Sequence, residues 1–474
     1  MFNIIYYYLI IINTSPLFFL NFSRWGDVFY IGGVNMNFIG KLKKHQSCVA
    51  VVGLGYVGLP LAVAFAKKVN VIGFDISENN ILRLKEGIDY TNEVGNIALK
   101  ESNILFTNDE NQLKNASFII IAVPTPIKED FTPDLDYVIS ASEIVGRNLQ
   151  KNTIIIYEST VYPGVTEEIC LKTLEKFSNL ECGKEFYIGY SPERINPGDR
   201  VHTLKNITKI VSGMNEEVRD EIKQLYKLVV DNVYEAESIK IAESAKLLEN
   251  TQRDINIAFM NEVAMIFSRL GISTSKVIEA MNTKWNALGF KPGLVGGHCI
   301  GIDPYYLIYK ATLNHSSSEI VALARKINNN MSEFVVENII QKLIKEKHAI
   351  KSDNIYILGI TFKENCPDIR NSRVLDIISR LKEYEINLKI IDPYADKKLV
   401  KQKYNIDLMD LNEINDADCL IFAVEHDRFR KIKLEDLRNF TKNAYKVNKP
   451  IIIDIKNIFN GKFLEENGFA YWGL

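Results

Sequence analysis

Residues 48–58 are Cys48-Val-Ala-Val-Val-Gly53-Leu-Gly55-Tyr56-Val57-Gly58, a short β-branched run that ends in a Gly-x-Gly-x-x-Gly motif. A helical pattern follows, from Leu59 to Lys68. The first glycine permits a tight turn, the second lets a pyrophosphate approach the backbone, and the third permits close packing of helix on strand. The helix N-terminus offers N–H groups to the phosphates. This stretch predicts a dinucleotide-binding unit, and the alternative is a tight turn that binds no ligand.

An acidic residue supports the dinucleotide interpretation. Val69–Phe74 is a second predicted strand, and Asp75 follows it, about 20 residues after Gly53. At the end of that strand a carboxylate can accept a hydrogen bond from the ribose 2′-OH, which favours NAD over NADP. The residues predicted to bind NAD here are Gly53, Gly55, Tyr56, Val57, Gly58 and Asp75.

The alternation of strands and helices continues through the first half of the chain. Further strands are predicted at 117–123, 153–157 and 186–189. Strands that alternate with helices predict a parallel sheet with helices on both faces. The last third repeats this alternation without the glycine motif, with strands predicted at 355–360, 388–391, 419–424 and 451–454.

A helical region separates these two α/β parts. The helical pattern runs from Ser238 to about Asn282 without a proline, and another runs from about Ser318 to Lys347. A long helix in this position is typical of a spine or a dimer interface. We therefore expect an α/β fold of two doubly wound Rossmann-like domains, joined by a long central helix and an all-helical middle region. The predicted parts are an N-terminal extension, an NAD-binding domain, a central helical domain with the dimer interface, and a second α/β domain, at 1–45, 46–230, 231–349 and 350–474.

Composition excludes several classes of protein. The chain has 474 residues, of which 47% are hydrophobic and 24% are charged, so it holds about three domains with sizeable cores. A net charge of −2 argues against a nucleic-acid surface or an acidic membrane partner. The six cysteines are scattered and the six histidines form no HxxH or HExxH cluster, so we expect no metal site and a reducing cytoplasm.

The N-terminus differs from the rest of the chain. Residues 1–22 are mostly apolar, and the first basic residue, Arg24, comes after the apolar run instead of before it as in a signal peptide. Asn13-Thr-Ser-Pro16 interrupts the run, which disfavours a spanning helix. We interpret residues 1–35 as an upstream extension from a misassigned start, with a membrane anchor as the alternative.

One cysteine stands on a glycine-rich loop, in Lys291-Pro-Gly293-Leu-Val-Gly296-Gly-His-Cys299-Ile-Gly-Ile-Asp303. Glycines let the backbone approach a ligand closely. A thiol on such a loop, with a carboxylate four residues later, indicates covalent chemistry. The alternative is a buried apolar cysteine, as most free cysteines are, and the local sequence weighs the two equally.

Other polar residues occupy positions where ligands bind in parallel sheets. Thr125 and Thr160 follow strands of the first sheet, where they can contact cofactor or substrate, or simply cap loops. Glu193, in a proline-flanked turn, is a candidate acid or base, or a solvated surface residue. Lys246 and Asn250 share one helix face and could stabilise an oxyanion and orient a water, or the lysine could be an ordinary surface residue.

Together these motifs resemble the nucleotide-sugar 6-dehydrogenase family, which includes UDP-glucose and GDP-mannose dehydrogenases. The resemblance runs from about residue 46 to the C-terminus. It rests on GLGYVGLPLA at 53–62, ESTVYPG at 158–164, SPERINPGD at 191–199, the Lys246 and Asn250 pair, GGHCIGIDPYY at 296–306, and FKENCPDIRNSR at 362–373.

Three segments resemble the enzymes of that family that act on UDP-N-acetylglucosamine or UDP-N-acetylgalactosamine, which make uronic acids for capsule and O-antigen. They are 249–258, 282–286 and 291–298. Pro197 stands where UDP-glucose enzymes typically carry a second glutamate, which favours the N-acetyl subgroup. Asn80 stands where they tend to have an arginine, which leaves the adenosine-ribose contact beyond Asp75 open.

The resemblance implies a mechanism and a set of roles. The C6 alcohol is oxidised twice with two NAD, and Cys299 carries a thiohemiacetal and then a thioester that water hydrolyses. Lys246 stabilises oxyanions, Asn250 and Asp303 hold the water, Glu193 acts as acid and base, and Thr160 positions water and cofactor.

The resemblance also implies where the ligands bind. Arg370 lies near the NAD, Lys363 lies at the nucleotide of the substrate, and Lys291 is a candidate for its diphosphate. Further substrate contacts are expected from Glu193, Lys246, Asn250, Gly293 and Gly296. The second α/β domain then binds UDP, and the central helix forms a homodimer. Three alternatives remain at this point: a UDP-glucose 6-dehydrogenase, a non-catalytic NAD-binding regulator, and a single-step β-hydroxyacid dehydrogenase.

Overall fold

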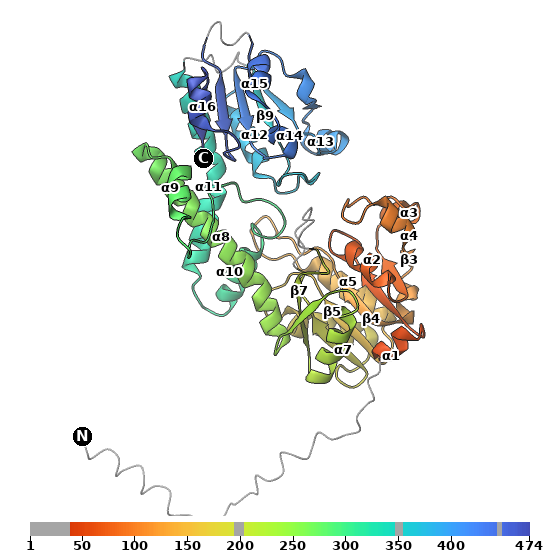
Figure 1. The fold of residues 1–474 in the computed structure, drawn as a ribbon. Helices are drawn as coiled ribbons and strands as arrows, with labels where there is room; N and C mark the ends of the chain where they lie inside the picture. The colour runs from red at the N-terminus through yellow and green to blue at the C-terminus, as the bar shows by residue number, and fades with distance from the viewer. Residues whose placement is uncertain (1–37, 194–202, 347–353, 443–447) are drawn as a thin grey trace, which may run out of the picture. The chain divides into compact units, whose positions relative to one another are not determined.

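The computed structural model describes residues 38–193, 203–346, 354–442 and 448–474 (Figure 1). The expected extension over residues 1–35 lies outside the described residues, and so does Pro197. A short helix that the sequence did not predict, α1 (Phe38–Lys43), precedes the first strand. Among the described residues no helix is both long and apolar enough to span a bilayer.

The first sheet has eight strands in the order β3-β2-β1-β4-β5-β6-β7-β8. Their bounds are β1 (Cys48–Val52), β2 (Val71–Phe74), β3 (Ile104–Thr107), β4 (Ala116–Ile121), β5 (Thr153–Tyr157), β6 (Phe186–Tyr190), β7 (Thr208–Gly213) and β8 (Asn232–Glu235). The six strands from β3 to β6 pair in parallel, as predicted for the five of them that the sequence identified. Strands β3, β7 and β8 were not predicted, and β7 pairs antiparallel with β6. Because of that reversal, β7 starts at the edge of the sheet where β5 and β6 end.

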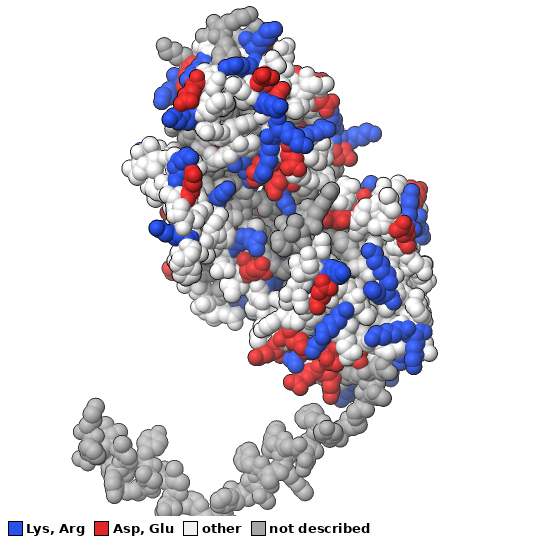
Figure 2. Space-filling model, in the orientation of Figure 1, with Lys and Arg blue, Asp and Glu red and all other residues white. Residues whose placement is uncertain are grey.

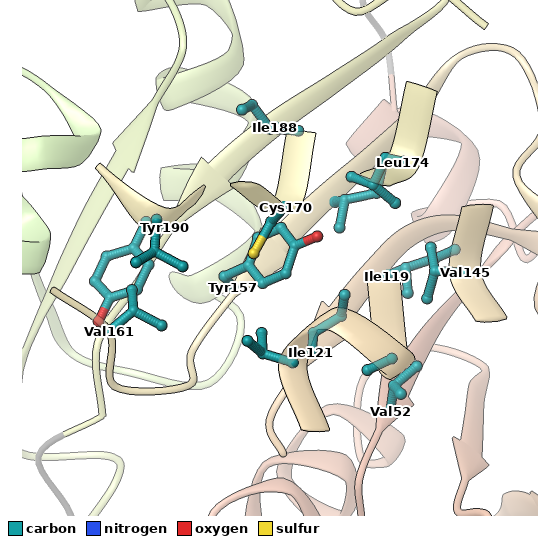
Figure 3. Packing of buried hydrophobic residues seen from close by; sticks show 14 of the residues in the cluster. Val52, Ile119, Ile121, Val145, Tyr157, Val161, Cys170, Leu174, Ile188 and Tyr190 are labelled. Carbon is teal, nitrogen blue, oxygen red and sulfur yellow. The ribbon is translucent and has the colours of Figure 1, made fainter. Parts of the chain in front are cut away.

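Buried side chains from five strands (β1, β2, β4, β5 and β6) and from several helices form the core on one face of this sheet. Helices α5 (Asp136–Asn148) and α6 (Leu171–Ser178) contribute Val138, Val145 and Leu174 to the cluster. Figure 3 shows Tyr157 of β5 beside Cys170 in the same cluster. Burial of each aliphatic side chain in this cluster contributes about 2 kcal/mol to the stability of the fold. Cys170 is buried in the same cluster, at 0% exposure. Cys170 is therefore a packing residue.

The helical region contains two helices where the sequence predicted one continuous pattern. Helix α8 (Ile239–Leu270) ends at Gly271, whose φ of 68° is left-handed, and α9 (Thr274–Met281) begins three residues later. Glycine adopts this conformation without a Cβ penalty and commonly ends helices. Ser238 caps the start of α8 by accepting the Ile241 N–H. Helix α11 (Glu319–Lys345) matches the second predicted helical stretch and packs on α8 through a buried Arg325–Asp254 pair at 2.5 Å.

The second α/β unit is a six-stranded parallel sheet in the order β11-β10-β9-β12-β13-β14, drawn in blue shades in Figure 1. Its strands are β9 (Ile355–Leu358), β10 (Leu388–Ile391), β11 (Leu408–Met409), β12 (Cys419–Phe422), β13 (Ile451–Asp454) and β14 (Ala470–Gly473). Ile355 and Ile357 of β9 pack with α11 and α12 (Arg373–Glu383), whereas Tyr356 and Leu358 face the opposite core. Because successive side chains of the strand point to opposite faces, both faces of the sheet carry a buried core, as expected for a doubly wound sheet.

The remaining α-helices flank the two sheets, except α10 (Asp303–Leu313), which packs against α8 and α11 in the helical region. The helices that flank the sheets are α2 (Gly58–Ala66), α3 (Glu78–Lys85), α4 (Asn96–Glu101), α7 (Glu216–Tyr226), α13 (Lys397–Tyr404), α14 (Asp427–Arg430), α15 (Leu434–Phe440) and α16 (Gly461–Glu466). On the face drawn in Figure 2, basic and acidic side chains are interspersed.

Candidate active site

The turn between β1 and α2 uses its three glycines for three different reasons. Gly53 has a φ of 91°, which disfavours any side chain. A Cβ on Gly58 would overlap the carbonyl oxygen of Gly53, so only glycine lets α2 pack this closely. A Cβ on Gly55 would point into open space, where no protein atom lies within 4 Å. The conformation of the turn therefore leaves room for a ligand at the middle glycine.

Asp75 is held at the end of β2 beside this turn. Its carboxylate accepts the Leu54 N–H at 3.0 Å and the Ser77 N–H at 2.9 Å. The Tyr90 hydroxyl donates to the Leu54 carbonyl oxygen at 2.7 Å and fixes the turn from the other side. An acidic side chain fixed next to an open glycine turn fits an adenosine ribose and a pyrophosphate.

Tyr56 of the turn contacts the C-terminal α/β unit through Arg370. The Arg370 guanidinium lies 5.1 Å from the centre of the Tyr56 ring and pairs with Asp368 at 2.7 Å. Burial raises the pKa of Asp368, but the hydrogen bonds from Arg370 and the nearby charges of His298 and Arg370 together bring the pKa below its usual value. The structure thus places Arg370 against Tyr56 of the glycine turn, and its contact with NAD stays a prediction.

Helix α8 brings together four of the predicted catalytic residues. Lys246 Nζ donates to the carbonyl oxygen of Glu193 at 2.7 Å. One turn further along, Asn250 Nδ2 donates to Asp303 Oδ2 at 2.5 Å. All four side chains are buried, with exposures of 6% or less. The lysine is therefore not an ordinary surface residue.

Cys299 lies at the turn that leads into α10, next to this cluster. The Asp303 N–H donates to the Cys299 carbonyl oxygen at 2.8 Å. Cys299 is exposed, whereas the other five cysteines are buried or half-buried. Its exposed position next to a helix N-terminus, which favours negative charge, argues against the packing alternative.

The glycines before Cys299 are fixed by helix α8 on one side and by the segment after β9 on the other. Asn261 of α8 makes two hydrogen bonds with Gly293, one to its carbonyl oxygen at 3.0 Å and one from its N–H at 2.8 Å. A Cβ on Gly296 would lie 2.5 Å from the Asn371 carbonyl oxygen. These contacts fix the loop between α8 and the segment after β9.

A second cluster of charges surrounds the Glu193 carboxylate. Lys209 Nζ lies 2.8 Å from Glu193 Oε2 and 3.0 Å from Glu158 Oε1. The Tyr226 hydroxyl donates to Glu158 Oε1. Glu158, Lys209 and Tyr226 were not predicted as site residues from the sequence. A signal was available, because Glu158 directly precedes the Ser159-Thr160 motif and Lys209 belongs to a β-branched run.

The two predicted threonines lie after β4 and β5 and are half-buried. The Thr125 carbonyl oxygen accepts the Tyr306 hydroxyl at 2.9 Å, which ties this loop to α10. The segment after Thr160 is tied to α8, because Glu243 accepts the Gly164 N–H at 2.6 Å and the Thr166 N–H at 3.0 Å.

Glu243 makes stability depend on pH. Burial raises its pKa to about 7, and its two N–H donors oppose a larger rise. Since the folded-state pKa lies above the ordinary value, the stabilisation is present below about pH 4.5 and is lost as pH rises through 7, by about 3 kcal/mol. We expect Glu243→Gln to flatten the decline of the melting temperature between pH 5 and 8. Parallel curves for the two proteins would contradict this.

The predicted substrate lysines lie outside these clusters. Lys291 is exposed, and Lys363 is half-buried in the loop after β9. That loop is anchored by buried His426, whose Nδ1 accepts the Asn365 N–H at 2.9 Å while Nε2 lies 3.1 Å from Asp392. This anchor was not predicted, because Asp392 and His426 lie far from Lys363 in sequence.

A cavity of about 280 Å³ lies beside the cysteine loop. Its lining includes Gly296, Gly301, Tyr305 and Arg373, together with Phe131 from the first domain. Phe131 stacks on Tyr305 with ring centres 4.8 Å apart. Asp376 also lines the cavity and pairs with Arg373 at 3.0 Å, which balances the arginine charge. The aromatic pair suits a ligand with a flat group.

An open glycine turn with a fixed aspartate, next to an exposed thiol and a buried lysine, defines an NAD-dependent dehydrogenase. Comparison with protein families gives the same class. Residues 47–230, 240–330 and 356–461 match the NAD binding, central and UDP binding domains of the UDP-glucose/GDP-mannose dehydrogenase family. The chain belongs to this family, and its cofactor is NAD.

Relatives narrow the substrate class. Protein CapL of Staphylococcus aureus is 51% identical over 87% of this chain and 96% of its own length. A UDP-N-acetyl-D-glucosamine 6-dehydrogenase of Salmonella typhi is 46% identical over 86% and 96%. The solved UDP-D-ManNAc dehydrogenase of Pyrococcus horikoshii is 30% identical, with a TM-score of 0.80 over 90% of this chain and 98% of its own. The chain is a nucleotide-sugar dehydrogenase of the UDP-glucose/GDP-mannose dehydrogenase family, and it is similar to members that are named for UDP-N-acetylhexosamines.

Proposed function

We propose that this enzyme oxidises the C6 alcohol of UDP-N-acetylglucosamine or UDP-N-acetylgalactosamine to the uronic acid. The observation that carries the proposal is the exposed Cys299 beside the buried Lys246, Asn250 and Asp303. The overall reaction converts one alcohol, two NAD⁺ and one water into one carboxylate, two NADH and three protons.

The side chains near the thiol suit the steps of such a reaction. NAD, when bound, accepts a hydride from C6 in each of the two oxidations. The Cys299 thiolate attacks the C6 aldehyde and forms a thiohemiacetal, whose oxidation leaves a thioester. Lys246 stabilises the oxyanions along this path, because a buried ammonium interacts strongly with nearby negative charge.

Hydrolysis of the thioester needs a held water and a base. Asn250 and Asp303 form a fixed hydrogen-bonded pair next to the Cys299 backbone, which suits them to hold the water. Glu193 acts as the acid and base of this step. Thr160, half-buried after β5, helps to position water and cofactor.

Ligand binding divides between the parts of the chain. NAD binds in a domain over residues 46–230, and Arg370 reaches it from the C-terminal unit. The residues that bind it are Gly53, Gly55, Tyr56, Val57, Gly58, Asp75, Thr125 and Arg370. Lys363 binds the nucleotide of the substrate in a domain over residues 350–474. Lys291 contacts the sugar diphosphate, and Gly293 and Gly296 are further contacts of the substrate. The central domain over residues 231–349 carries the cysteine loop.

Helices α8 and α9 also suit a homodimer interface. They expose large apolar side chains, including Leu248, Phe259, Ile266 and Met281, and Trp285 just beyond α9 is 96% exposed. Exposed apolar patches of this kind mark interaction sites. The similarity to a protein named CapL supports a role in capsule synthesis. A role in O-antigen synthesis and a cytoplasmic location are further parts of the proposal.

A substrate panel tests the proposal. Purified enzyme with NAD and each UDP-sugar in turn is followed by the absorbance of NADH. We expect turnover of UDP-N-acetylglucosamine or UDP-N-acetylgalactosamine to exceed that of UDP-glucose by at least about tenfold, because a site built around an N-acetyl group leaves polar groups unpaired without it. Faster turnover of UDP-glucose would overturn the subgroup assignment.

UDP-N-acetylmannosamine is the second candidate substrate. The likeness to the Pyrococcus horikoshii enzyme, which is named for that sugar, favours its inclusion. The closer identity to the Salmonella typhi enzyme favours the glucosamine sugar. The same panel separates them by the ratio of kcat/KM.

A further inference from the structure

A buried lysine lies behind Glu193 at the edge of the first sheet where ligands bind. Glu158 follows the carboxyl end of β5, and Glu193 follows that of β6. Lys209 is the second residue of β7, and because β7 is antiparallel to β6 its start lies at the same edge. The reversal of one strand thus brings a cation to the carboxyl ends of two parallel strands.

The charges of this cluster are enclosed. Lys209 is 1% exposed, Glu158 is 3% exposed and Glu193 is 5% exposed. The single ammonium contacts both carboxylates, at 2.8 Å and 3.0 Å. Burying a charge is costly unless it is paired, so each member of the cluster depends on the others.

The groups that face the Glu193 carboxylate come from several elements. Lys209 of β7 contacts it directly, and Glu158 after β5 shares that lysine. Tyr226, the last residue of α7, donates its hydroxyl to Glu158, and Lys246 of α8 holds the Glu193 backbone. An opposite charge in contact favours the ionised carboxylate, and a like charge nearby disfavours it.

We propose that Lys209 is a positioning residue that keeps Glu193 ionised and oriented for thioester hydrolysis, with Glu158 as the opposing charge. This inference rests on the proposed function, in which Glu193 is the base of that step. Lys209 itself contacts neither substrate nor cofactor. A purely structural role, tying β5, β6 and β7 together, is the outcome that the test must separate.

Lys209→Met removes the charge and keeps most of the side-chain volume. With UDP-N-acetylglucosamine, or the panel sugar turned over fastest, we expect the NADH burst to persist while kcat at pH 7 falls at least tenfold. Intact-protein mass should show the acyl group accumulating on Cys299. The acid limb of the kcat profile should move to higher pH by about one to three units, because loss of a contacting cation raises the pKa of a carboxylate. Lys209→Arg should restore the profile.

Glu158→Gln should shift the acid limb of the kcat profile in the opposite direction. Removing the competing carboxylate should move the acid limb to lower pH, and this variant also serves if Lys209→Met does not fold. Lys223→Met is the matched control, since Lys223 pairs with Glu235 at 2.6 Å elsewhere in the same domain, and its profile should be unchanged.

Three results would overturn the proposal. One is a Lys209→Met profile of reduced height but unchanged shape, which is the structural outcome. Another is an acid limb of the kcat profile that stays in place or moves to higher pH in Glu158→Gln. The third is wild-type thioester hydrolysis in Glu193→Gln, which would remove the role of Glu193 itself. The first two leave the proposed function intact, so the two failures are distinguishable.

Discussion

Replacing Cys299 by alanine will abolish acid formation while leaving NAD binding within about twofold of wild type. The thiol is the group that holds the aldehyde for its second oxidation, and loss of a covalent nucleophile typically costs a thousandfold or more in kcat. The exposed position of Cys299 means that a smaller side chain leaves no internal cavity, so folding should be preserved. NADH absorbance measures the oxidation, mass spectrometry identifies the acid product, and a titration with NAD gives the affinity for the cofactor.

Cys182→Ala is the matched control for that experiment. Cys182 is half-buried in the first domain, with its sulfur 3.7 Å from that of Met214, and lies outside the predicted site. Its variant should turn over substrate at the wild-type rate. A wild-type yield of uronic acid from Cys299→Ala would show that the reaction does not pass through this cysteine.

Two glycines of the first turn should respond differently to the same substitution. A Cβ on Gly55 enters open space, so Gly55→Val should keep the melting temperature. The new side chain occupies the space where a pyrophosphate approaches the backbone, and we expect NAD affinity to fall by about 100-fold, or about 3 kcal/mol. A Cβ on Gly58 overlaps the Gly53 carbonyl oxygen, so Gly58→Val should destabilise the domain itself by about 3 kcal/mol or more.

Thermal melting without NAD and calorimetric titration with NAD separate these effects. We expect an unchanged melting temperature with weak NAD binding for Gly55→Val, and a lowered melting temperature for Gly58→Val. Normal NAD affinity in Gly55→Val would show that the cofactor does not use the open side of the turn.

The sequence predicted most of the fold because its local patterns and its tertiary structure agree. The buried β-branched runs at β1, β5, β10 and β13 became strands at or near their expected bounds. The end of α8 at Gly271 was missed because a helical pattern continues past it, and only the left-handed conformation shows the break. The reversal of β7 was missed because strand direction depends on tertiary pairing, which one strand's sequence does not encode.

The candidate site was predictable where spacing along a helix determines geometry. Lys246 and Asn250 lie one turn apart, and the structure gives them Glu193 and Asp303 as partners. Lys209 and His426 were not predicted, because each acts on a loop distant in sequence. For Lys209, the partner Glu158 lies far along the chain and meets it only through the reversed strand.

The number of NADH formed per molecule of sugar tests the central claim most directly. With UDP-N-acetylglucosamine limiting and NAD in excess, NADH is read by absorbance and the uronic acid by mass spectrometry. Two oxidations at one site, linked through Cys299, predict two NADH for each acid and no free aldehyde. A yield of one NADH with an aldehyde or ketone product would contradict the account.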